Sequence, residues 1–156
     1  MVGPIDIVGT RFHYLGPFSA HRIAIWGEVF LTVEHAYQAS RIKPGPEREA
    51  IKNAASPLAA WEEGQKFKNN PVLTVPSFDK DAIMEELFRA KLAQHPHIRE
   101  ILLESGDRTI IKMHEQDAYW GTGPGGKGQN KMGKIWMKIR AEIQTSRQIT
   151  TDLQFF

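Results

Sequence analysis

Apolar residues recur every three or four positions along most of the chain, the spacing typical of helices that bury one face. A capping side chain or a proline in the first turn precedes several of these segments. The helices predicted in this way span residues 33–42, 46–54, 57–67, 79–94 and 96–103, and another follows Asn130. We expect the helix that starts near Asp79 to be the longest. In the last helix the buried stripe is expected to be Met132, Ile135, Trp136, Ile139 and Ile143.

The first predicted helix carries polar groups beside its apolar stripe. Thr32 is placed to cap it, and its inward stripe is expected to be Val33, Ala36, Tyr37 and Ser40. Glu34, Gln38 and Arg41 form a neighbouring stripe. We therefore expect Glu34 at the edge of the helix, in its first turn.

Extended segments are fewer and shorter. Ile5–Val8 and Arg22–Trp26 are rich in β-branched and aromatic residues and are bounded by glycines, which predicts a small antiparallel sheet. Arg108–Met113 is predicted to be another strand. The pattern does not alternate between strands and helices. It favours a mainly α (α+β) fold, a compact multihelical domain with a small antiparallel β element.

Composition limits the function classes more than it names one. The chain has 156 residues, 41% of them hydrophobic and 24% charged, which predicts a single globular domain over 1–156 with its core at about 10–143 and a tail at 147–156. Without cysteine, neither disulfides nor thiolate chemistry is available. No apolar run is long enough to span a membrane, and the N-terminus does not resemble a signal peptide. We expect a cytoplasmic protein.

The segment Asp117–Gly133 concentrates most of the candidate chemistry. An acid and two aromatics, Tyr119 and Trp120, lead into five glycines between Gly121 and Gly128, and Asn130 is placed to cap the following helix. A glycine loop at a helix start offers free N–H donors and a positive dipole end, so it predicts an anion site, with Lys127 beside it. A flexible surface loop is the plainer alternative.

Two familiar nucleotide motifs do not fit this loop. Gly121, Gly123 and Gly126 match G-x-G-x-x-G, but no second strand follows the helix, so a dinucleotide-binding unit is rejected. A P-loop is rejected because Gly128 and Gln129 follow Lys127 where a hydroxyl residue is needed.

Glu34 and Asp117 are candidate acids for cleavage of a glycosidic bond, since one carboxyl can stabilise positive charge on the sugar while the other handles a proton. A first-turn acid and a turn-forming aspartate are the plainer interpretations. His35, next to Glu34, lacks the H-E-x-x-H spacing, and neither it nor His95-Pro96-His97 predicts a metal site. No metal and no cofactor are expected.

Four blocks of sequence resemble one family. Tyr14–Ser19, Thr32–Gln38, Asp117–Gly133 and Met137–Arg140 occur in the order and with the motifs of the NADAR, or YbiA-like, domain. The resemblance covers roughly residues 10–143. It implies a mostly helical fold and N-glycosidase chemistry, the hydrolysis of the bond between ribose C1 and a nitrogen.

The resemblance also implies the site. Glu34 and Asp117 match its acids, and Lys112 stands where many members have a glutamate. Residues expected to contact an ADP-ribose or ribose-phosphate substrate are Phe18, Ser19, His35, Gln38, Arg41, Tyr119, Trp120, Gly121, Gly123, Gly126, Gly128 and Asn130. The substrate expected first is ADP-ribosylated guanine in DNA or RNA. The alternatives are phosphoribosylamino-pyrimidine intermediates of riboflavin synthesis, a non-catalytic reader of ADP-ribose, and a basic nucleic-acid-binding domain.

Overall fold

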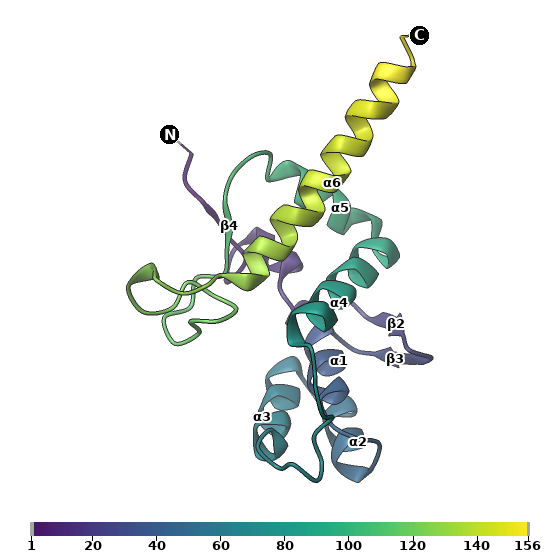
Figure 1. The fold of residues 1–156 in the computed structure, drawn as a ribbon, viewed down its shortest axis with the longest axis vertical. Coiled ribbons are helices and arrows are strands. Elements are labelled where there is room, and N and C mark those ends of the chain that lie inside the picture. The colour runs from purple at the N-terminus through teal and green to yellow at the C-terminus, as the bar shows by residue number, and fades with distance from the viewer. Residues whose placement is uncertain (1, 156) are drawn as a thin grey trace. The chain divides into compact units, whose positions relative to one another are not determined.

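A computed structural model describes residues 2–155, and these form six α-helices and two small two-stranded sheets (Figure 1). The helices are α1 (Val33–Ser40), α2 (Pro46–Lys52), α3 (Pro57–Phe67), α4 (Lys80–Gln94), α5 (Pro96–Glu104) and α6 (Lys131–Leu153). The strands are β1 (Ile5–Asp6), β2 (Ile23–Ile25), β3 (Glu28–Phe30) and β4 (Ile110–Ile111). Short 3-10 turns occupy Arg11–Leu15 and Pro124–Gly126. The predicted mainly α fold with a small antiparallel element is confirmed.

Contacts between residues divide the chain into two units. One runs from His13 to Ile98, and the other joins the N-terminal segment up to Phe12 with the chain from Arg99 onward. Each unit has its own buried residues, so each is described by itself. The single domain over 1–156 stays a prediction. None of the helices within residues 2–155 has both the length and the apolar character needed to cross a membrane.

The unit His13–Ile98 is built around α1, which packs against α2, α3 and α4 (Figure 1). The Thr32 side chain accepts a hydrogen bond from the His35 amide and caps the helix, as predicted. Every residue from Val33 to Ala39 is buried, because helices cover α1 on more than one side. The expectation that Glu34 lies at the helix edge is therefore wrong.

The antiparallel sheet is a hairpin of β2 and β3, in which Ile23 faces Phe30 and Ile25 faces Glu28. Trp26 and Gly27 form its two-residue turn, both with positive φ, 54° and 76°. This left-handed geometry matches the twist of tight hairpins. β2 packs on α4, which ties the hairpin to the helices.

In the other unit β1 pairs with β4 in a parallel arrangement, with Ile5 opposite Ile110. The first extended segment therefore finds its partner about a hundred residues later in the chain and does not pair with 22–26 as expected. The predicted strand over 108–113 is only two residues long. Helix α6 covers β4 and buries the stripe predicted for it, Met132, Ile135, Trp136, Ile139 and Ile143.

Helix α6 is the longest helix of residues 2–155, with 23 residues against 15 in α4, so the expectation for α4 is wrong. The predicted tail at 147–156 is helical up to Leu153, and Phe156 lies outside the described residues. Ile149, Leu153 and Phe155 are 55%, 69% and 82% exposed. This part of the helix therefore rests on its own backbone hydrogen bonds and not on a packed face.

Gly133→Ala is expected to destabilise the chain by about 2–4 kcal/mol, because overpacking a tight helix–strand contact is costly. A Cβ at Gly133 would collide with the carbonyl oxygen of Ile110 in β4 and with the side chain of Asn130. Urea unfolding followed by circular dichroism measures the change. Gly3→Ala is the control, since a Cβ there meets nothing within 4 Å. Equal stability of the two variants would contradict this packing.

Candidate functional site

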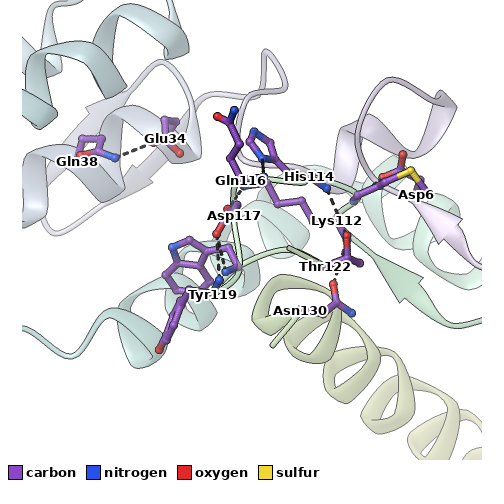
Figure 2. A network of polar contacts seen from close by, with 12 residues as sticks. Asp6, Glu34, Gln38, Lys112, His114, Gln116, Asp117, Tyr119, Thr122 and Asn130 are labelled. Carbon is purple, nitrogen blue, oxygen red and sulfur yellow. Dashed lines mark hydrogen bonds and ion pairs between the residues drawn. The ribbon is translucent and has the colours of Figure 1, made fainter. Parts of the chain in front are cut away.

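Asp117 lies in a tight turn that its own carboxylate stabilises. Oδ1 accepts hydrogen bonds from the amides of Trp120, at 2.9 Å, and Tyr119, at 3.3 Å (Figure 2). Oδ2 lies 2.6 Å from Nζ of Lys112, whose side chain is 18% exposed against 21% for Asp117. The carboxylate is thus held by two amides and one ammonium group in a half-buried setting.

These contacts set the charge of Asp117. Burial raises the pKa of its carboxyl, but the hydrogen bond and charge of Lys112, together with the amides of Trp120 and Tyr119, outweigh burial and hold the pKa below its ordinary value. Asp117 is therefore ionised at neutral pH. An ionised carboxylate can accept a proton or balance positive charge, but it has no proton to donate.

Most amides of the glycine loop donate to carbonyl oxygens of the chain itself, contrary to the expectation of an anion site built from free amides. The amides of Thr122 and Gly123 donate to the carbonyl oxygens of Lys112 and His114, and those of Gly128 and Asn130 donate to Thr122 and Gly121. The amides of Gln129, Lys131 and Met132 donate to Ala118, Tyr119 and Trp120. The first turn of α6 is thus closed by the segment that precedes the loop.

The glycines at 121, 123 and 128 make this closure possible. A Cβ at Gly121 would lie 2.8 Å from the Lys112 carbonyl oxygen, and one at Gly128 would lie 2.5 Å from the oxygen of Gly121. Gly123 has φ +64°, as has Gly125, and Gly126 has φ +72°. Gly125 and Gly126 have open space beside them. Close backbone approach explains the first three positions, and backbone conformation explains the last two.

Asn130 occupies the N-cap position of α6 but does not cap it with its side chain. Its backbone is left-handed, with φ 49° and ψ 44°. Instead, Oδ1 accepts from the Lys112 amide at 3.0 Å (Figure 2). Nδ2 donates to the Ile110 carbonyl oxygen at 2.9 Å. Asn130 therefore joins the end of the loop to β4 and to the residue that pairs with Asp117.

The aromatics of this segment are half-buried. The rings of Tyr119 and Trp120 meet edge to face, with centroids 4.9 Å apart and an interplanar angle of 89°. Nζ of Lys131 lies 5.8 Å from the centre of the Tyr119 ring. Their remaining exposed surface is available to a ligand.

Glu34, in the unit His13–Ile98, is held from two sides. Its side chain accepts from Nε2 of Gln38 at 2.8 Å (Figure 2). Its amide donates to the Pro17 carbonyl oxygen at 3.1 Å. Glu34 and Gln38 are 5% and 3% exposed. Oε1 of Gln38 is buried without a hydrogen-bond partner and points at Gly64 of α3. Turning the amide over would place an oxygen against the carboxylate, so the observed orientation is the favourable one.

His35 holds α1 in place and has no surface for a substrate. It is fully buried, and Thr32 and Ala54 each bond one of its ring nitrogens, at 2.8 and 2.9 Å. Because the Ala54 partner is a carbonyl oxygen, Nε2 carries the proton and Nδ1 accepts from the Thr32 hydroxyl.

The other predicted contact residues of this unit differ in access. Phe18 is 46% exposed and Arg41 is half-buried, with its guanidinium 5.7 Å from the centre of the Tyr37 ring. Ser19 is 4% exposed and its hydroxyl contacts Lys91 and His21. Phe18 and Arg41 can therefore reach a ligand directly, whereas Ser19 is occupied by the protein.

Sequence reasoning gave no structural role to Lys112 and passed over Lys91. A basic residue five positions before an aspartate was the only local signal for the Lys112–Asp117 pair, and a lysine within the apolar pattern of α4 was the signal for Lys91. Within residues 2–155 no group of three or more His, Cys, Asp or Glu side chains is arranged to hold a metal ion.

The two candidate acids lie in different units of the chain. Glu34 belongs to the unit His13–Ile98 and Asp117 to the other unit, and their meeting at one pocket stays a prediction. A hollow of about 280 Å³ along α6 is lined by Arg99, Ser146, Arg147, Thr150, Thr151 and Gln154, none of which is a predicted site residue.

Lys112→Met is expected to raise the pKa of Asp117, because burial remains while the ammonium group that lowers the pKa is gone. The stabilisation from this pair is present above the ordinary carboxyl pKa of about 3.9 and is lost as the pH falls through the lowered value. A carbon-13 NMR titration of the Asp117 carboxyl measures the shift. Lys127→Met, an exposed site on the same loop, is the control. An unchanged titration in Lys112→Met would show that the pair does not form in solution.

Gly64→Ala is expected to destabilise the chain by about 1–3 kcal/mol, because the new methyl group overlaps the side-chain amide of Gln38. The sign is diagnostic, since alanine in a helix interior is ordinarily about 1 kcal/mol more favourable than glycine. Thermal and urea unfolding measure the change. A stabilised variant would mean that Gln38 does not lie against Gly64.

Comparisons with known proteins agree on the family. The NADAR domain model matches residues 10–144. N-glycosidase YbiA of Escherichia coli (strain K12) is 32% identical over 126 residues, which is 81% of this chain and 78% of that protein. N-glycosidase Npun_R5314 of Nostoc punctiforme is 33% identical over 136 residues, 85% of this chain and 86% of that protein.

A solved structure and a longer relative are also similar to this chain. The NMR structure of E. coli YbiA aligns with a TM-score of 0.78 and 27% identity, covering 95% of this chain and 90% of that one. The chloroplastic riboflavin biosynthesis protein PYRR of Zea mays is 30% identical over 149 residues, 88% of this chain but 24% of that protein. With most of its length matched by the family model and by these relatives, the chain belongs to the NADAR domain family.

Proposed function

We propose that the chain is an N-glycosidase that hydrolyses the bond between ribose C1 and a nitrogen, with Glu34 as its principal catalytic group. The observation that carries this proposal is the setting of Glu34: a carboxylate 5% exposed, oriented by Gln38 and fixed through its amide to Pro17. Relatives named N-glycosidase that match across most of the chain support the reaction class.

The reaction breaks the C1–N bond and forms a C1–O bond to water. As the nitrogen leaves with the bonding electrons, positive charge develops on C1 and the ring oxygen, and a nearby carboxylate stabilises it. Glu34 then takes one proton from the attacking water, and the leaving nitrogen gains one from solvent or from an acid. Hydrogen-bond donation from Gln38 to Oε1 orients the carboxylate of Glu34.

We do not assign Asp117 the role of proton donor. Because Lys112 and two amides hold it ionised, we assign it to orienting ribose hydroxyls or balancing charge, and not to protonating the leaving group. Tyr119 and Trp120 offer aromatic surface beside it, and Phe18 offers a similar face in the other unit. Such faces suit stacking on a base.

We assign the glycine loop a structural role and not a role in binding phosphate. Most of its amides are used within the loop, so phosphate oxygens of a substrate would be met by side chains such as those of Arg41 and Lys127. Both are cations with surface remaining, and guanidinium or ammonium groups bind phosphate through charge-assisted hydrogen bonds.

ADP-ribosylated guanine in nucleic acid is the substrate that we propose first. The net charge of +2 suits a polyanionic substrate, and the exposed Phe18 and the half-buried Tyr119–Trp120 pair suit a base. A phosphoribosylamino-pyrimidine is the second candidate, favoured by the name of the maize relative as a riboflavin biosynthesis protein.

Glu34→Gln is expected to lower kcat for release of the ribosyl group by about 100-fold or more, the usual range for loss of a general base or charge stabiliser, with a smaller change in KM. Chromatography of free ADP-ribose released from guanine-modified DNA measures it, alongside release from the pyrimidine ribosylamine. Glu62→Gln, an exposed carboxylate on α3, is the matched control.

The outcomes separate the candidate functions. Release from one substrate only identifies that substrate. Tight binding of ADP-ribose without release from either compound would replace the enzyme with a reader. Salt-sensitive affinity for DNA alone, with none for ADP-ribose, would indicate a basic nucleic-acid-binding domain. Full activity in Glu34→Gln would overturn the catalytic assignment.

A further inference from the structure

Lys91 is a buried amine without a carboxylate partner among residues 2–155. It lies on α4 among Met84, Leu87 and Phe88, all fully buried, and has no exposed surface of its own. Its Nζ donates to the Gly16 carbonyl oxygen at 2.8 Å and to the Ser19 hydroxyl. Within residues 2–155 no carboxylate pairs with it, and burial lowers its pKa to about 7. An unpaired ionisable group in a core is costly, and an apolar side chain of the same length would avoid that cost.

A chain of hydrogen bonds runs from this amine to the surface. The Ser19 hydroxyl lies 2.8 Å from Nδ1 of His21, and Nε2 of His21 lies 2.8 Å from Nε2 of His97, which is exposed. The Ser19 hydroxyl also lies 3.3 Å from the carbonyl oxygens of Tyr14 and Gly16. An arrangement of protons that satisfies every member of the chain turns this hydroxyl toward His21. Lys91 donates to Ser19, Ser19 donates to His21, and His21 donates to His97.

This arrangement requires a neutral His21. Burial, then the charges of Lys91, His95, His97 and His13, lower the pKa of His21 to about 4. The titratable neighbours from every packed element are thus basic, and the ring of Tyr14 completes the surroundings, 5.1 Å from His21. A neutral His21 can accept from Ser19 at Nδ1, and the Ser19 oxygen then accepts from Lys91.

The object held by this network is the loop from Gly16 to Ser19. Lys91 bonds its first carbonyl oxygen and its last side chain, and the Ser19 amide closes on Gly16 at 3.5 Å. Inside the loop, the Pro17 carbonyl oxygen accepts the amide of Glu34 at 3.1 Å. The loop therefore lies between the amine of Lys91 and the start of α1.

We propose that Lys91 is a positioning residue for Glu34, acting through the Gly16–Ser19 loop, with Ser19, His21 and His97 as the hydrogen-bonded support of that loop. Lys91 does not touch the substrate, because its amine has no exposed surface. It fixes the Pro17 carbonyl oxygen, which in turn fixes the first turn of α1, and it holds Phe18 at the exposed tip of the same loop. This inference rests on the proposed function only for the catalytic role of Glu34.

A metal site and a nucleophilic lysine are both less consistent with these contacts. No three ligand side chains among residues 2–155 converge on one point, and Nε2 of His95 is bonded to the Arg22 carbonyl oxygen at 2.6 Å. Nucleophilic attack by Lys91 would need a path to a substrate, which full burial denies.

Lys91→Met tests the proposal, since methionine has a similar length and no charge. We expect the variant to be at least as stable as the parent in urea, because a desolvated cation is removed. We also expect amide hydrogen exchange at Glu34 to speed up at least 10-fold while exchange at Ala39, in the last turn of α1, is unchanged. Lys68→Met, an exposed lysine after α3, is the matched control.

Catalysis provides a second readout. Lys91→Met is expected to lower kcat at least 10-fold with less than a 3-fold change in KM, since Glu34 is displaced and the aromatic and cationic groups remain. Ser19→Ala removes one of the two bonds from Lys91 and is expected to give a smaller increase in Glu34 exchange. Ser19→Ala therefore still tests the positioning role if Lys91→Met fails to fold.

The positioning role of Lys91 and the catalytic role of Glu34 can be disproved independently. Unchanged Glu34 exchange in folded Lys91→Met would overturn the positioning role, whatever the activity. Faster Glu34 exchange in a protein whose Glu34→Gln variant retains full activity would uphold the mechanical link and overturn the proposed function. A stable Lys91→Met with parental kcat would show that the loop does not control catalysis.

Discussion

Desolvation of the first turns of α1 is the constraint on which the unit His13–Ile98 depends. Three polar side chains, Glu34, His35 and Gln38, are buried on a helix that α2, α3 and α4 surround. A buried polar group without a partner costs about 1–3 kcal/mol, so the helix fits only where nearly all of these groups have one; Oε1 of Gln38 is the exception among residues 2–155. His35 bonds at both ring nitrogens, and Gln38 donates to Glu34. Rotating or sliding α1 would break several of these bonds together, which fixes the direction of Glu34.

The segment around Asp117 solves the same problem with its backbone. Most of its amides donate to neighbouring carbonyl oxygens. The side-chain amide of Asn130 joins the loop to Ile110 in β4 at one end and to Lys112 at the other. Ordering a loop in this way costs more conformational entropy than leaving it flexible. The ordered loop holds Tyr119 and Trp120 in fixed positions. The close approach that closure demands explains the glycines better than free donors for an anion do.

Features governed by neighbouring residues were predictable from sequence. Thr32 caps α1 as expected. Ser56 and Asp79 cap α3 and α4, and Pro46 and Pro57 begin α2 and α3, because these signals act within one turn. Features governed by distant partners were not. The pairing of β1 with β4, the burial of Glu34 and the turn of Asn130 toward Ile110 all depend on what packs against the segment. The family resemblance located the candidate acids, but it did not reveal their hydrogen-bond partners.

Asp117 and Lys91 show two ways of keeping an ionisable group away from water. Asp117 has a counter-charge and two amides, so its charged form is the favoured one. Lys91 has only a carbonyl oxygen and a hydroxyl, so burial acts against its charge. Between pH 7 and the ordinary lysine value of about 10.4 the unfolded chain binds the extra proton, and stability rises with pH across that window. A methionine at this position would remove this pH dependence of the free energy of unfolding. The packing around residue 91 therefore does not itself require an amine.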